Sequence, residues 1–154
     1  MSTPAQQPGR HASGSSPAGD RLVVHNARAE IDAAEERLLA LLTQHGYGEA
    51  ARFAVRLAFE EAVVNAFRHG HKNLPADTPA EVTFAVGSDV AEISVTDQGP
   101  GYVPEQVPDC TLDENLEKVS GRGLMLIRSF MTDVRHEMGG RRLVMTYRKD
   151  AEAA

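Results

Sequence analysis

The sequence lacks three features that would mark a secreted, membrane-spanning or nucleic-acid-binding protein. Its one cysteine, Cys110, cannot form a disulfide within the chain. No apolar run approaches the roughly 18 residues that cross a bilayer, and the N-terminus has no apolar core of a secretory signal. The formal charge is −6, and lysines and arginines form no cluster in the part expected to fold. We therefore predict a cytoplasmic protein whose partners are proteins or small molecules, with no nucleic acid and no membrane among them.

The N-terminal segment is also poor in apolar residues. Residues 1–20 contain no Leu, Ile, Val, Phe or Tyr and are rich in Pro, Gly, Ser and Ala. Such a segment cannot bury enough apolar surface to offset the entropy lost on ordering. We predict a disordered tail over 1–20 and a single folded domain over 21–149, which is long enough to bury a core.

Hydrophobic periodicity then predicts the elements of that domain. The predicted strands are 21–25, 81–86, 91–96, 133–138 and 141–148, and the predicted helices are 29–42, 49–67 and 124–131. Gly139-Gly140 is typical of a two-residue hairpin turn, and the long loop over 98–120 is typical of a lid. This order favours an α+β fold, a two-layer sandwich in which helices cover one face of a mixed, mostly antiparallel sheet.

Two polar residues in the second predicted helix are candidates for chemistry. Glu61 and Asn65 are four residues apart, so their side chains lie on the same helical face. A carboxylate can accept a proton from an attacking hydroxyl, and an amide oxygen one turn away can ligate Mg²⁺. The alternative is the solvated stripe of an amphipathic helix, the commoner meaning of this spacing. Asn65 favours a site, because an amide in mid-helix among apolar residues needs a partner.

Asp97 is the next candidate. It follows the strand predicted over 91–96 in phase with the apolar residues, so its carboxylate should point to the apolar side. An adenine amino group can supply the hydrogen-bond donor that a buried carboxylate needs, and Gly99 and Gly101 would let the backbone approach the ring. The alternative is an ordinary Asp-x-Gly turn, in which the carboxylate binds its own backbone.

A glycine-rich segment before the last predicted helix, Gly121-Arg122-Gly123-Leu124, is the third candidate. A turn of this kind at a helix N-terminus presents backbone amides to phosphate, although it can also be a plain helix start. Lys118 and Arg122 are close enough in sequence for either to reach a terminal phosphate. Thr146 is out of phase with its apolar neighbours on the last strand, and therefore faces either the site or solvent.

In this order and at these spacings, the elements resemble the motifs of the GHKL ATPase superfamily, which has the Bergerat fold. Glu61 to Gly70 resembles the N-box, Asp97 to Gly101 the G1 box, and Gly121 to Leu124 the G2 box. Within the superfamily the sequence is most similar to the short bacterial anti-sigma-factor serine kinases of the RsbW and SpoIIAB type. The resemblance covers residues 21 to about 149 and implies ATP and Mg²⁺ as cofactors.

The resemblance also implies a role for each matching residue. Glu61 would be the catalytic general base, Asn65 would ligate Mg²⁺, and Asp97 would bind the adenine amino group. Gly99 and Gly101 would shape the adenine pocket. The nucleotide site would further include His69, Lys118, Gly121, Arg122, Gly123, Leu124 and Thr146, the last supporting the adenine side.

The implied function is that of a serine/threonine protein kinase. It would phosphorylate a serine on a STAS-type anti-sigma-factor antagonist and sequester a sigma factor, commonly as a homodimer. The alternative is a non-catalytic partner-switch module that uses ATP only as an allosteric ligand, since target surfaces lie outside the ATP motifs. A histidine-kinase catalytic fragment is a weaker possibility, because residues 21–48 cannot supply the phospho-accepting helical hairpin.

Overall fold

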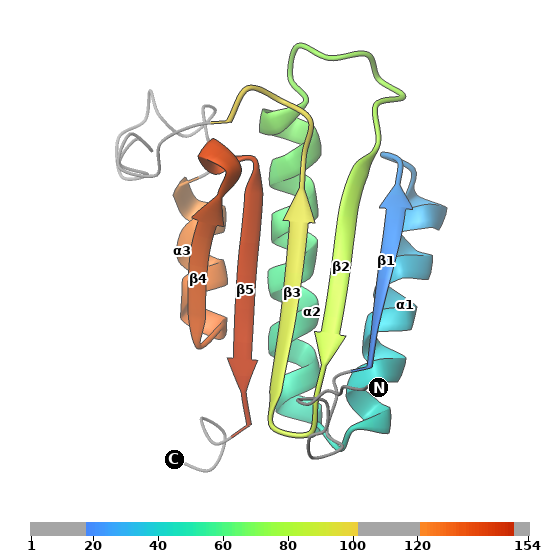
Figure 1. Cartoon of the computed structure of the whole chain (residues 1–154), viewed down its shortest axis with the longest axis vertical. Helices are drawn as coiled ribbons and strands as arrows, with labels where there is room; N and C mark the ends of the chain where they lie inside the picture. The colour runs from blue at the N-terminus through green and yellow to red at the C-terminus, as the bar shows by residue number, and fades with distance from the viewer. Residues whose placement is uncertain (1–17, 102–120, 150–154) are drawn as a thin grey trace, which may run out of the picture.

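The computed structural model describes residues 18–101 and 121–149. Its sheet has five strands in the order β1-β2-β3-β5-β4, with the helices on one face (Figure 1). The strands are β1 (Ala18–Val24), β2 (Ala80–Val86), β3 (Val90–Thr96), β4 (Asp133–Glu137) and β5 (Arg142–Arg148), and the α-helices are α1 (Arg28–Gln44), α2 (Glu49–Asn65) and α3 (Gly121–Phe130). The predicted α+β sandwich is confirmed, and every strand pairing within the described residues is antiparallel. None of the described helices has the length and hydropathy needed to span a bilayer.

The core lies between the sheet and the helices because the strands alternate between apolar and polar residues. In β2 every second residue from Ala80 to Val86 is buried, and these residues face the helices. Helix α2 lies between α1 and α3 (Figure 1), and its Phe59 is fully buried, with its ring edge-to-face on Phe84 at a centroid distance of 5.7 Å. The apolar circumference of this helix is explained by its central position.

The boundaries of three elements differ from the prediction. β1 begins at Ala18, inside the segment predicted to be a tail, because the main chain of residues 18–20 pairs with β2 whatever the side chains. Helix α2 ends at Asn65 and continues as a π-helical turn, Ala66–Gly70. Helix α3 includes the glycine-rich segment as its first turn. The rest of the predicted tail and residues 102–120 of the predicted lid lie outside the described residues.

The hairpin between β4 and β5 also differs from the predicted two-residue turn. The connection consists of Met138 to Arg141, with a short 3₁₀ turn over Met138–Gly140. Met138, Gly139 and Gly140 all have positive φ angles, of 54°, 67° and 96°. Because three consecutive residues turn in the left-handed region, Arg141 lies outside the strand ladder and reaches the end of the sheet where α2 also ends.

Candidate functional site

A cavity of about 110 Å³ lies where the three predicted motifs meet. Its walls come from the C-terminal end of α2 with the π-helical turn, the end of β3 with the loop that follows it, the first turn of α3, and the start of β5 with the connection that precedes it. The predicted residues among those lining it are Asn65, His69, Asp97, Gly101 and Leu124. The fold therefore brings together residues that are far apart in sequence and come from all three motifs.

Asp97 forms the predicted Asp-x-Gly turn and also lines the cavity. Its side chain faces the π-helical turn that follows α2, since a Cβ placed on Gly70 would lie 2.5 Å from the carboxylate carbon. Oδ1 accepts a hydrogen bond of 2.8 Å from the Gly99 N–H, which is the predicted Asp-x-Gly turn. Within the described residues no donor bonds to Oδ2, and Asp97 lines the cavity. The turn thus fixes one oxygen and leaves the other for a ligand donor.

The electrostatic surroundings of Asp97 are mixed. Burial raises the pKa of its carboxyl, whereas the hydrogen bond from Gly99 and the charges of His71 and Arg141 act to lower this pKa. A half-buried carboxylate with this balance needs a hydrogen-bond donor more than a solvated one does. An exocyclic amine is a donor of the right kind, because it satisfies the oxygen without adding charge.

The glycines of the Asp97 loop pack closely against other parts of the backbone. A Cβ on Gly99 would lie 1.9 Å from the Gly70 carbonyl oxygen. Gly101 has a φ of +83°, and a Cβ there would lie 2.2 Å from the Gly139 carbonyl oxygen. The loop is therefore packed between two other backbones, and glycine is needed for that contact. Gly101 lines the cavity, whereas Gly99 is not among the described residues that line it.

Asn65 has an unpaired oxygen and lines the cavity. Its Oδ1 is buried, and within the described residues it has no hydrogen-bond partner. Leaving a buried acceptor unpaired costs about 1–3 kcal/mol, so the oxygen fits a ligand that the protein alone does not supply. An amide oxygen is a ligand suited to Mg²⁺. Glu61 lies one turn earlier on α2, partly exposed, and is not among the described residues that line the cavity.

The remaining predicted residues lie at varying distances from the cavity. His69 lines it from the π-helical turn, and burial together with the neighbouring cations Arg68 and Lys72 lowers the pKa of His69, which favours the neutral imidazole. Gly121, Arg122 and Gly123 form the first turn of α3, just before Leu124. Helix N-termini favour phosphate groups, so this placement suits the predicted role. Lys118 lies outside the described residues.

Thr146 is not brought to the cavity. On β5, Leu143 and Met145 face the helices and belong to the core, so Thr146 lies on the opposite face of the sheet, paired with Glu92 of β3. Of the two orientations left open by the sequence, the structure has the one that points away from the site. A strand cannot present neighbouring residues to the same face, which rules out the predicted support of adenine by Thr146.

Two residues around Asp97 were missed by the sequence interpretation. His71 is buried directly after the π-helical turn, and its Nε2 accepts a hydrogen bond of 2.9 Å from the Gln98 N–H. Arg141 lines the cavity, and its carbonyl accepts a hydrogen bond of 2.9 Å from the Asp97 N–H. Both contacts depend on irregular turns, and no residue pattern in the sequence indicates them.

Comparisons with known proteins agree with this geometry. A family model described as a histidine kinase-like ATPase domain matches residues 24–147. The chain belongs to this family. The match confirms the predicted resemblance to the GHKL ATPases, and for a domain of an ATPase family the nucleotide implied is ATP. A search among curated proteins finds no match.

One solved structure resembles this histidine kinase-like ATPase domain in fold. It is the crystal structure of the RsbU and RsbW domains of Rv1364c from Mycobacterium tuberculosis, with a TM-score of 0.60 and 16% sequence identity. The similarity covers 85% of this chain and 32% of that chain. At this identity the likeness shows the fold alone.

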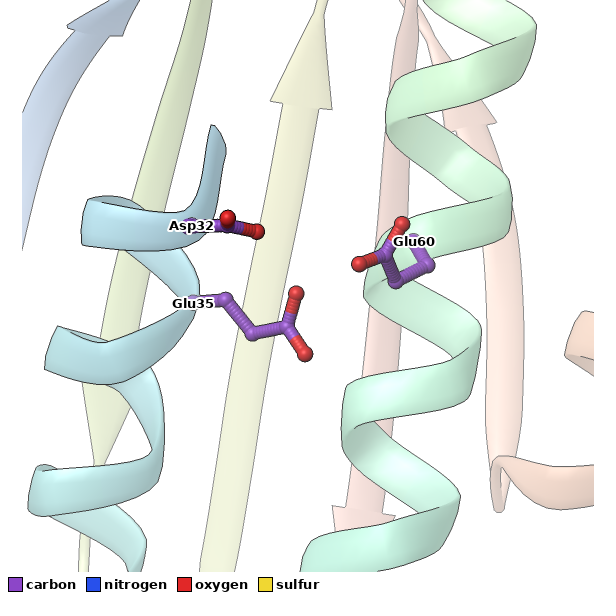
Figure 2. Close-up of side chains that lie close together, drawn as sticks. All are labelled: Asp32, Glu35 and Glu60. Atoms are coloured by element: carbon purple, nitrogen blue, oxygen red, sulfur yellow. The ribbon is translucent and has the colours of Figure 1, made fainter. Parts of the chain in front are cut away.

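The ATPase domain also has an acidic cluster away from the cavity, between α1 and α2. Figure 2 shows Asp32 and Glu35 of α1 and Glu60 of α2 with their carboxylates directed toward one another, within 4.8 Å. The guanidinium of Arg28 lies among them, with Nη2 at 2.7 Å from Asp32, 2.9 Å from Glu60 and 3.8 Å from Glu35. Since Arg28 of α1 pairs with Glu60 of α2, and Arg56 of α2 lies 3.4 Å from Glu35 of α1, the cluster is an ion-pair network that joins the helices.

Glu35 is the buried member of this network and gives it a pH dependence. Desolvation, followed by its hydrogen bond with Glu60, raises the pKa of Glu35 from 4.5 to about 7. The same hydrogen bond lowers the pKa of Glu60, because Glu35 holds the shared proton and donates it. The folded state therefore binds this proton more tightly than the unfolded chain. The resulting stability is present below about pH 4.5 and is lost as the pH rises through about 7.

We expect Glu35→Gln to remove this loss, because a glutamine can donate to Glu60 but cannot ionise. The free energy of unfolding of Glu35→Gln minus that of the wild type should therefore become more positive by roughly 1–2 kcal/mol as the pH is raised from about 5 to about 8. Urea denaturation at both pH values measures the difference. Glu36→Gln, an exposed neighbour on α1, is the control and should follow the wild type. A Glu35→Gln protein with wild-type pH dependence would contradict the assignment.

Proposed function

We propose that the cavity binds ATP with Mg²⁺ and that the domain is a serine/threonine protein kinase. The observation that carries the proposal is a pair of polar groups in one cavity, the half-buried Asp97 carboxylate and the unpaired Asn65 oxygen. A purine amine fits the first and a hard cation fits the second. Membership of the ATPase family supports the choice of ATP as the ligand.

The proposal gives each residue a role. Asp97 selects the base through its free oxygen, and Asn65 holds the cation. Glu61, on the same face of α2 but outside the cavity lining, would orient an incoming serine hydroxyl and take its proton. When bound, Mg-ATP supplies the transferable phosphoryl group and the charge that must be neutralised. The amides at the start of α3 favour phosphate oxygens.

The substrate we propose is a serine on a STAS-type anti-sigma-factor antagonist, and a sigma factor is the second partner. The proposal rests on the resemblance to kinases of the RsbW and SpoIIAB type and is consistent with the fold shared with a protein that has an RsbW domain. A homodimer and a cytoplasmic location belong to the same proposal. The alternative remains a partner-switch module that binds ATP without transferring phosphate.

Partner capture in two nucleotide states tests the function. The immobilised protein is exposed to a lysate of its own source in Mg-ATP and, in parallel, in Mg-ADP, and the bound proteins and their phosphoserines are identified by mass spectrometry. We expect a sigma factor and a STAS-domain protein to bind, with their proportions set by the nucleotide and with phosphoserine on the STAS protein only in Mg-ATP. Capture that is identical in Mg-ATP, Mg-ADP and EDTA would contradict the proposal.

A further inference from the structure

His71 is a buried histidine that connects the turn after α2 with the loop after β3. Its own N–H donates to the Ala66 carbonyl at 2.9 Å, which fixes its backbone at the end of the π-helical turn. Its ring lies edge-to-face on Phe67, with the ring centroids 5.4 Å apart. Its Nε2 accepts a hydrogen bond of 2.9 Å from the Gln98 N–H. The imidazole is therefore held on one side by the turn and bonded on the other to the loop.

Packing alone does not explain an imidazole at this position. Nδ1 of His71 is also buried, and within the described residues it has no hydrogen-bond partner. A polar group without a partner is costly to bury, whereas a methionine or leucine side chain would fill the space against Phe67 without that cost. What the imidazole supplies in return is the acceptor nitrogen Nε2, which binds the Gln98 N–H.

The hydrogen bond also defines the protonation state of the ring. A nitrogen that accepts a hydrogen bond must have a free lone pair, so the proton of His71 is on Nδ1 and the imidazole is neutral in this arrangement. A proton on Nε2, in the other neutral tautomer or in the cation, would set one N–H against another. His71 can therefore hold Gln98 in only one of its three forms.

Three consecutive backbone amides of the Asp97 loop have acceptors. The Asp97 N–H donates to the Arg141 carbonyl at 2.9 Å, and the Gly99 N–H donates to Asp97 Oδ1 at 2.8 Å. The amide between them, that of Gln98, donates to His71. Of the three acceptors, His71 is the one side chain that comes from outside the loop. A single substitution can therefore remove it without changing the loop itself.

The bond between His71 and Gln98 joins two sides of the cavity. Asn65 lies at the end of α2, just before the π-helical turn, and Asp97 directly follows β3; both line the cavity. Among the described residues, no other hydrogen bond connects the π-helical turn or His71 with the loop that follows β3. This bond therefore restrains the Asp97 loop relative to the helix that carries Asn65.

We propose that His71 is a positioning residue of the nucleotide site, which acts through the Gln98 amide by holding the Asp97 loop where its carboxylate meets the adenine amine. This inference rests on the proposed binding of ATP. His71 is not among the described residues that line the cavity, so its effect on a ligand is indirect. A loop already held in its binding conformation loses less freedom when the ligand binds. Removal of the acceptor should therefore weaken the contact that Asp97 makes.

The test uses two variants that differ in the acceptor. His71→Gln and His71→Met have side chains of similar length and shape, but only glutamine has an oxygen that can accept the Gln98 N–H. His45→Met controls for the replacement of a partly buried histidine, since His45 follows α1 and is not among the described residues that line the cavity. Titration calorimetry measures the affinity of each protein for Mg-ATP and for Mg-inosine triphosphate, in which a carbonyl oxygen replaces the amine.

We expect His71→Met to bind Mg-ATP about 5- to 10-fold more weakly than the wild type, the size of one hydrogen bond, and His71→Gln to recover most of that affinity. Inosine triphosphate should lose less affinity in His71→Met, because it has no amine for Asp97 to bind. His45→Met should bind Mg-ATP as the wild type does. An equal loss for both nucleotides would overturn the inference, as would an equal loss in His71→Gln and His71→Met.

A measurement on the wild type keeps the inference testable if a variant fails to fold. NMR of the ¹⁵N-labelled His71 ring at about pH 8, where an ordinary imidazole is neutral, should show a proton on Nδ1 and none on Nε2, with and without Mg-ATP. A proton on Nε2 would overturn the inference. If the wild type binds no Mg-ATP, the proposed function fails and the inference fails with it. If the wild type binds and His71→Met matches it, only the inference fails.

Discussion

Glu61→Gln should reduce phosphoryl transfer to the protein substrate by a factor of about 10²–10⁴ and leave the affinity for Mg-ATP within about twofold. Glutamine has the size of glutamate but cannot take the proton of the attacking hydroxyl. Affinity should persist because Glu61 is not among the described residues that line the cavity. Single-turnover transfer from labelled ATP to the captured STAS protein measures the first quantity, and calorimetry measures the second.

The adjacent glutamate provides a matched control for this experiment. Glu60 faces α1, where it pairs with Arg28 at 2.9 Å, and it takes no part in the proposed chemistry. Glu60→Gln should therefore transfer phosphate at the wild-type rate. Transfer that survives in Glu61→Gln would exclude Glu61 as the base. A wild-type protein that binds Mg-ATP and its partners without any transfer would instead favour the partner-switch module.

The layers of the fold follow from periodicity and could be predicted from the sequence. The alternation in β2 and β3 fixes which residues face the helices, because a one-residue shift would bury every polar side chain of the strand. The apolar circumference of α2 likewise predicts its central position, seen in Figure 1. The tail boundary was less accurate, because a strand can be held by backbone hydrogen bonds even where its side chains are small or polar.

The site was predictable wherever a regular element carries the residue. Asn65 and Asp97 lie at the ends of α2 and β3, and both reach the cavity as the periodicity of those elements predicts. Irregular backbone explains what was missed. The π-helical turn of Ala66–Gly70 and the left-handed residues before Arg141 have no periodic signature, so the contributions of Arg141 and His71 became visible only in the structure.

Thr146 is a residue for which the family resemblance predicted a role that the structure does not support. Its role came from the family resemblance, whereas the alternation of β5 allowed it to face either way, and the core position of Met145 decides that it faces away. At the start of β5, Leu143 and the preceding Arg141 line the cavity. Residues at this end of the strand are therefore the ones within reach of a ligand. Family roles are therefore best transferred after the face of each residue is established.

The central claim is that Asp97 binds the base of ATP, and Asp97→Asn changes only the group that makes this contact. Asparagine can still accept the Gly99 N–H through its oxygen, so the turn should remain. Its amide nitrogen would then meet the adenine amine, a donor opposite a donor, in place of the charged acceptor. Losing a charge-assisted hydrogen bond and leaving a buried donor unpaired should weaken binding about 100-fold.

Titration calorimetry of Mg-ATP with the wild type, Asp97→Asn and Asp89→Asn tests the claim most directly. Asp89 is an exposed aspartate in the turn between β2 and β3, so its variant controls for the loss of one charge. The account predicts that the wild type and Asp89→Asn bind Mg-ATP equally and that Asp97→Asn binds about 100-fold more weakly. A wild type that does not bind Mg-ATP, or an Asp97→Asn protein that binds it as tightly as the wild type, would contradict it.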